Sequence, residues 1–180
     1  INANGPVSKT GTLKCKEEIE INGPLTNNGG EIECEELEIN GPLVNTSDFS
    51  IKANEVEING PLASSVSLKF PKDLKIAGPV GCEGNLEAQK IKIAGPIDIE
   101  GSLTASEKIK IRLGRRASDD RSLIHCDYIQ APYVEISSKG YDSPFIEVAL
   151  KGKQIILRNV RHKGPVEGNL TLEDGATHED

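Results

Sequence analysis

The 180-residue chain contains 36% hydrophobic residues but only 3% aromatic residues, together with 18 glycines and 10 prolines, and its formal net charge is -7. It has no apolar run near 18 residues, no signal peptide and no lipidation motif. The composition therefore excludes a membrane-spanning helix within this sequence and a core built on large aromatic side chains.

A short phrase repeats along the first half of the chain. EIEINGPL at 18–25 returns as ELEINGPL at 36–43 and EVEINGPL at 55–62, and then as DLKIAGPV and KIKIAGPI. The Gly-Pro pairs in this part stand 17 to 19 residues apart, which leaves no room for a helix in each repeat. Apolar residues alternate as they do in strands with one buried face, and Gly-Pro favours a corner. Each repeat is predicted to contain two or three short strands joined by corners.

One position of each repeat, two residues after its first Leu or Ile, is usually small. The nine positions are Cys15, Cys34, Ala53, Phe70, Ala88, Ala105, Ala131, Gly152 and Leu172. Stacked repeats bury such positions in a continuous core column. The sequence thus predicts an all-β, single-domain, right-handed parallel β-helix of about nine short coils. The six-residue period of left-handed β-helices does not fit the spacing.

The predicted β-helix spans residues 1–172, with regular coils over 1–113 and coils with longer corner loops over 114–172. At about 4.8 Å between paired strands, nine coils give a rod roughly 43 Å long. Residues 173–180 are predicted to form an acidic, mobile tail. Ile1 falls at the repeat position of Ile19, so the sequence begins in mid-coil. A cytoplasmic protein is expected, and a membrane-targeting segment outside this sequence is left open.

The four cysteines are interpreted as reduced thiols of a cytoplasmic protein. Cys15 and Cys34 occupy the small-residue column and are expected to be core residues rather than a disulfide or metal pair. Neighbouring coils would bring them within bridging distance, so their oxidation is left open. Cys82 and Cys126 fall outside the column and have no CxxC partner.

Asparagines and charges also recur in register. Asn22, Asn40 and Asn59 directly precede the Gly-Pro corner and are predicted to hydrogen-bond along the rod as a structural ladder. Residues 1–60 hold 11 acids and 4 lysines, so the whole net charge of -7 lies there. The position between the inward pairs reads Glu20, Glu38, Glu57, Lys75, Lys92 and Lys110. This face is either solvated, or it meets a charged partner or a cation.

The stretch GNLEAQKIKIAGPIDIEGSLTASEKIKI at 84–111 resembles the coil pattern of the bactofilins, polymer-forming cytoskeletal proteins of bacteria. The pattern is Gly-x-apolar-x-Ala, two spacers, and apolar-x-apolar-x-Gly. The resemblance covers residues 1–113 well and the last three coils by register. It implies a right-handed β-helix that assembles end to end without a nucleotide, often on a membrane. Unpaired strand edges at the terminal coils favour such self-association.

All six arginines lie in the second half of the chain, around corners that follow Ile111, Ile136 and Leu157. Insertions on one edge of a repeat protein often bind a partner, here an acidic ligand or protein. The candidate binding residues are Arg112, Arg115, Arg116, Arg121, Lys139, Arg158, Arg161 and Lys163. Single-stranded nucleic acid is not expected, because aromatic residues are not interleaved with these cations.

Three function classes follow from these patterns. The first is a structural scaffold that associates with itself; the second is a non-enzymatic binding module that uses the arginine-rich corners. The third is a polysaccharide-acting β-helix enzyme, for which Glu38 and Glu57 would be the candidate carboxylates. Nothing in the spacing demands catalysis, so no enzyme activity, cofactor or metal is expected.

Overall fold

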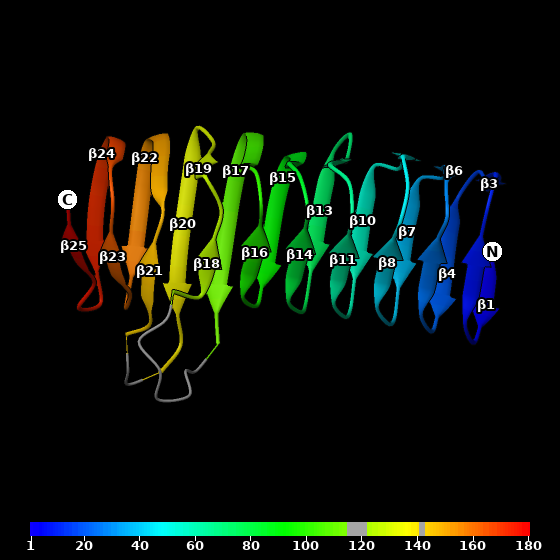
Figure 1. Ribbon diagram of the computed structural model, residues 1–180, viewed down its shortest axis with the longest axis horizontal. Helices are drawn as coiled ribbons and strands as arrows, with labels where there is room; N and C mark the ends of the chain where they lie inside the picture. Colours follow the sequence, from blue (N-terminus) through cyan, green and yellow to red (C-terminus); the bar gives the residue numbers. More distant parts are fainter. Residues whose placement is uncertain (115–121, 141–142) are drawn as a thin grey trace.

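The computed structural model describes residues 1–114, 122–140 and 143–180. Within these residues the regular structure consists of 25 strands, without a helix, and the strand pairs are parallel. The chain winds as a β-solenoid of about nine turns. Figure 1 shows the coils side by side along the long axis, with the two termini at opposite ends. The predicted all-β parallel solenoid is confirmed.

The coils present three faces, and face A contains the apolar-x-apolar pairs that precede the Gly-Pro corners. Its strands are β1 (Asn2–Asn4), β4 (Glu18–Asn22), β7 (Glu36–Ile39), β10 (Glu55–Ile58), β13 (Asp73–Ile76), β15 (Leu86–Ala94), β17 (Leu103–Leu113), β20 (Tyr133–Ser138), β22 (Ala149–Arg158) and β24 (Val166–Glu173). Four of these strands, β15, β17, β22 and β24, are long because they begin on a second face and continue round a corner.

Face B follows the Gly-Pro corners. Its strands are β2 (Val7–Lys9), β5 (Leu25–Asn27), β8 (Leu43–Asn45), β11 (Leu62–Ser64), β14 (Val80–Cys82), β16 (Ile97–Ile99), β18 (Ile124–His125), β21 (Phe145–Glu147), β23 (Arg161–Lys163) and β25 (Thr177–Glu179). Face C holds the first halves of the long strands and five short ones. These are β3 (Thr12–Lys14), β6 (Gly30–Glu33), β9 (Phe49–Lys52), β12 (Leu68–Lys69) and β19 (Tyr128–Gln130).

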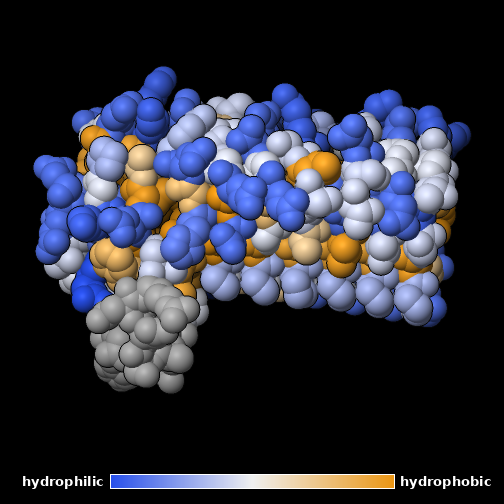
Figure 2. All heavy atoms as spheres, viewed as in Figure 1, coloured by the Kyte–Doolittle hydropathy of each residue, from blue (hydrophilic) through white to orange (hydrophobic). Residues whose placement is uncertain are grey.

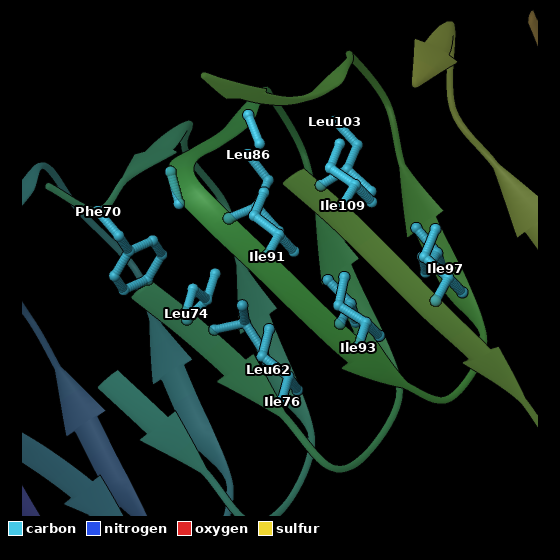
Figure 3. Packing of buried hydrophobic residues seen from close by; sticks show 14 of the residues in the cluster. Leu62, Phe70, Leu74, Ile76, Leu86, Ile91, Ile93, Ile97, Leu103 and Ile109 are labelled. Atoms are coloured by element: carbon cyan, nitrogen blue, oxygen red, sulfur yellow. The ribbon is translucent and has the colours of Figure 1, made fainter. Parts of the chain in front are cut away.

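Aliphatic columns fill the interior. Ile76 pairs in register with Ile93, Ile91 with Ile109, and Leu86 with Leu103, and all of these side chains are buried. Figure 3 shows them pointing into the space between the faces. Because each coil repeats the same few branched side chains, the core is continuous along the rod and needs few aromatic residues.

The small-residue column lies on face C. Its buried members are Cys34, Ala53, Phe70, Ala88, Ala105 and Ala131, and Cys15 and Gly152 are partly buried. Leu172 was predicted as the ninth member of this column, but it does not belong to it. It pairs with Leu157 on face A, and Gly168 takes the column position over Gly152. The prediction was wrong because Leu170-x-Leu172 fits both the apolar pattern that leads into the face C column and the apolar-x-apolar pair of face A.

The Gly-Pro corners stack so closely that they admit no side chain on the glycine. A Cβ added to Gly41 would lie 2.6 Å from the carbonyl carbon of Gly23, and one added to Gly60 would lie 2.6 Å from that of Gly41. Gly78 meets Gly60 in the same way. Close approach of successive backbones therefore explains why glycine recurs here.

Asparagine amides form the predicted ladder beside these corners. Asn40 Nδ2 donates to Asn22 Oδ1 at 3.0 Å, and Asn59 Nδ2 donates to Asn40 Oδ1 at 2.9 Å. The ladder is confirmed, and it links three coils at one edge of face A.

The last coils differ from the prediction at their ends. Residues 173–180, predicted as a mobile acidic tail, include β25, which pairs with β23, so the solenoid extends to Glu179. The corner after Leu157 is short, because β22 ends at Arg158 and β23 begins at Arg161. None of the described residues forms a helix capable of crossing a membrane.

Candidate functional site

Both ends of the rod present strand edges. Among the described residues, β1, β2 and β3 have no partner on their outer side at one end, and neither do β24 and β25 at the other. Unpaired edges of this kind carry free amide and carbonyl groups, which favour pairing with another chain.

The end formed by β24 also presents the interior of the solenoid. Leu172 lies over Leu157 at the end of a face A core column and is 44% exposed. Leu170 and Val166 end two neighbouring columns and are partly buried. This surface, Val166, Leu170 and Leu172, is called the C-terminal apolar end below. It is core-like in composition and open to a partner.

The opposite end is more polar, because a lysine closes a buried hydrogen-bonded column. Lys9 Nζ donates to Gly11 O at 2.7 Å, to Gly29 O at 2.8 Å and to Asn27 Oδ1 at 3.0 Å. The column continues inward, since Asn27 donates to Asn45 Oδ1 at 2.6 Å and Asn45 to Ser64 Oγ at 3.1 Å. Burial lowers the pKa of Lys9. Ile1, 51% exposed, adds apolar surface at this end.

This buried polar column was missed by the sequence reasoning. Lys9, Asn27, Asn45, Ser64 and Cys82 stand two residues after the apolar residue of each Gly-Pro-apolar unit. The first four of these residues are polar, yet they occupy strand positions whose side chains should point inward. This pattern is the signal that could have revealed the buried polar column.

Figure 2 shows that hydrophobic residues lie between hydrophilic residues on the visible face of the rod.

The candidate binding residues are divided between two faces and the loops. Arg112 and Arg158 lie at one edge of face A, two coils apart, with Ser137 between them. Arg161 and Lys163 lie on face B, and Lys139 is exposed after β20. Arg115, Arg116 and Arg121 lie outside the described residues. The structure thus brings Arg112 and Arg158 together but places Arg161 and Lys163 elsewhere.

Carboxylates neutralise part of this arginine edge. Arg158 forms ion pairs with Glu173 at 2.6 Å and with Glu135 at 3.6 Å. Lys163 lies 3.7 Å from Glu147. A hollow formed by β15, β17 and β20 remains cationic, although Lys110 pairs with Glu135 in it at 2.7 Å. Its lining includes Lys92, Lys110, Arg112, Glu135 and Ser137.

The cysteines are free thiols. Cys34 lies next to Cys15 in the face C column, where its backbone amide bonds to Lys52 O. Burial raises the pKa of Cys34 to about 11 and that of Cys126 to about 12, while a hydrogen bond from the Glu17 backbone lowers the pKa of Cys15. Glu38 and Glu57, the carboxylates of the enzyme hypothesis, face outward side by side on β7 and β10.

Two stacked histidines close the face B core column near the C-terminal end. Their ring centroids are 5.0 Å apart, and His162 Nδ1 lies 2.9 Å from His178 Nδ1. His162 Nε2 lies 2.8 Å from Val148 O. Such a pair requires one neutral Nδ1 to accept the proton of the other. Burial lowers the pKa of His162, so its neutral form is favoured.

Acid is expected to loosen this last coil. Because the folded pKa of His162 lies below the unfolded value of 6.5, the unfolded chain binds more protons below that pH, and stability falls as the pH decreases. Between pH 7.5 and 5 we expect a loss of about 1–2 kcal/mol, the cost of a broken buried hydrogen bond, in local opening of β23 and β25. Hydrogen exchange of β23 and β25, with β4 as internal reference, measures the free energy of this local opening.

The matched control uses the exposed His125 on β18. His125→Gln should keep the pH dependence, whereas His162→Gln, which retains a donor for Val148 O, should flatten it. An unchanged pH profile in His162→Gln would show that the histidine pair does not control the opening.

Comparison of the chain with family models, with curated proteins and with solved structures finds no match.

Proposed function

We propose that this protein is a structural scaffold, similar to bactofilins, that associates with itself end to end through its terminal coils. The observation that carries the proposal is the C-terminal apolar end, where core leucine columns and the strand edges of β24 and β25 are open together. A second copy that added its own strands there would bury Leu172 and satisfy the free backbone groups. The proposal assigns the chain no catalytic role.

Salt dependence tests this proposal against contacts made by surface charges. Burial of apolar surface and backbone pairing persist at high ionic strength, whereas exposed charge pairs are screened. Light scattering of the purified chain should therefore report assemblies at both 0.05 M and 1 M NaCl. Particles of single-chain mass at both salt concentrations would reject the scaffold proposal.

A second candidate function is binding of an acidic ligand at the cationic hollow. Among the described residues, Arg112 and Lys92 form no ion pair, and both line the hollow. A guanidinium beside an ammonium is suited to a phosphate-like anion.

Inorganic pyrophosphate is the probe for this second candidate. In calorimetric titrations, Arg112→Gln should weaken its binding about tenfold, the loss of one charge-assisted contact. Arg161→Gln, on face B, should leave it unchanged. Equal effects of both substitutions would indicate general charge attraction rather than a site.

A further inference from the structure

The outer surface of face A separates its charges along the rod. Two columns of outward side chains run across β4 to β17, and each changes from acidic to basic along the rod, the first after its fourth residue and the second after its third. The first column is Glu18, Glu36, Glu55, Asp73, Lys90 and Lys108. The second column is Glu20, Glu38, Glu57, Lys75, Lys92 and Lys110. We call these twelve residues the charged face.

Ion pairs within the chain satisfy the middle of the charged face and Lys110 at its basic end. Lys75 pairs with Glu55 and Glu57, and Lys90 lies 3.4 Å from Asp73. Lys110 lies 2.7 Å from Glu135 on β20. In the part of the chain that the structure describes, Glu36 and Lys92 form no ion pair. Like charges directly opposite one another on neighbouring strands are unfavourable. The charges without an ion pair, such as Glu36 and Lys92, would therefore gain most from charges supplied by another molecule.

Read from opposite ends of the rod, the charges of two copies of the charged face are largely of opposite sign. Two copies can be placed face to face about a two-fold axis that is parallel to the strands and passes between β10 and β13. The axis then sets β10 opposite β13 of the other copy, β7 opposite β15, and β4 opposite β17. In the second column this brings Glu57 to Lys75, Glu38 to Lys92, and Glu20 to Lys110.

The first column follows the same rule with one exception. Glu36 meets Lys90 and Glu18 meets Lys108, whereas Glu55 meets Asp73. Five of the six contacts thus join opposite charges, and the two-fold axis makes each of them twice. In a parallel arrangement the same coils would meet, so that the acidic residues of β7 would face the acidic residues of β7 in the other copy. The sequence of charges selects the antiparallel arrangement.

We propose that the charged face binds a second copy of this chain, antiparallel and side by side, through these complementary columns. A partner of one charge sign would match only half of the face, whereas a second copy matches both halves. This lateral contact does not depend on the end-to-end association proposed above, because it uses charged side chains on the side of the rod. It would let antiparallel rods or filaments bundle at low salt.

Reciprocal charge reversal tests the contact. Dimerisation is followed by sedimentation equilibrium at 20 mM NaCl. It is measured in the unmodified chain and in a Leu172→Glu background, in which end-to-end association is expected to be lost. Lys92→Glu and Glu38→Lys should each weaken dimerisation about tenfold, because each creates two like-charge contacts per dimer. The double variant should restore it, and 1 M NaCl should abolish it. Lys153→Glu, an exposed reversal outside the charged face, is the matched control.

A carbodiimide cross-link decides the orientation. Glu38 and Lys92 lie three coils apart in one chain, about 14 Å at 4.8 Å per coil, which is too far for a zero-length cross-link. An amide joining their peptides must therefore form between two copies. Dimers without this cross-link, failure of the double variant to restore dimerisation, or a single-chain mass at 20 mM NaCl would each overturn the proposal.

Discussion

Leu172→Glu is expected to abolish end-to-end assembly while leaving the solenoid folded. The side chain is 44% exposed in the isolated chain, so a carboxylate there remains hydrated. In an assembly the same carboxylate would be buried against the next coil without a partner, and the burial energy of the leucine would be lost. Together these effects should raise the concentration needed for assembly roughly 100-fold or more. Sedimentation velocity in 1 M NaCl at a series of protein concentrations measures the concentration at which assembly begins.

The matched control for this substitution is Val44→Glu. Val44 is 37% exposed, but it lies on β8 at the side of the rod. Assembly should persist in Val44→Glu, and both variants should retain the strand signal in circular dichroism. If Leu172→Glu assembled as well as Val44→Glu, the C-terminal apolar end would not be the contact.

Gly60→Ala is expected to destabilise the solenoid by about 3 kcal/mol. The new methyl group would lie 2.6 Å from backbone atoms of Gly41, and backbone on both sides is fixed by strand pairing. The coils can separate only by breaking hydrogen bonds of the neighbouring strands. For a chain of this length, the loss corresponds to a decrease in melting temperature of roughly 6–12 °C. Thermal unfolding followed by circular dichroism measures it.

Gly81→Ala provides the comparison for Gly60→Ala. Gly81 lies on β14 in the following coil, and a Cβ there would meet only Leu62 O, at 3.9 Å. Gly81→Ala should therefore be close to neutral or slightly stabilising. Equal melting temperatures of the two variants would show that the corners can move apart, and that close stacking does not explain the recurring glycine.

The architecture could be predicted from the sequence because each coil repeats the same local rules. The alternation of Ile19 and Ile21, the Gly-Pro corner and the next apolar residue recur often enough to fix the register of neighbouring coils. The role of the glycines was only partly predicted, because the contact that excludes a side chain is between coils and not within one. The predicted right-handed winding stays a prediction.

Prediction was weaker where the repeat becomes irregular. Leu172 was assigned to the wrong column because Leu170-x-Leu172 resembles the apolar pattern of face C as well as that of face A, where the strand pairing places it. The acidic sequence around β25 did not indicate a strand, although β25 pairs with β23 and places His178 beside His162. Arg112 and Arg161 lie on different faces because the chain turns from face A to face B between β22 and β23. These outcomes depend on contacts between coils rather than on local pattern.

Electron microscopy of the 180-residue chain in 1 M NaCl is the most direct test of the proposed scaffold. At this salt concentration the Debye length is about 3 Å, so the lateral charge contacts are screened and only end-to-end contacts should persist. Single filaments are expected, with an axial repeat of roughly 43 Å or a multiple of it, from nine coils at about 4.8 Å each. Isolated rods of one chain at every protein concentration would contradict the scaffold proposal.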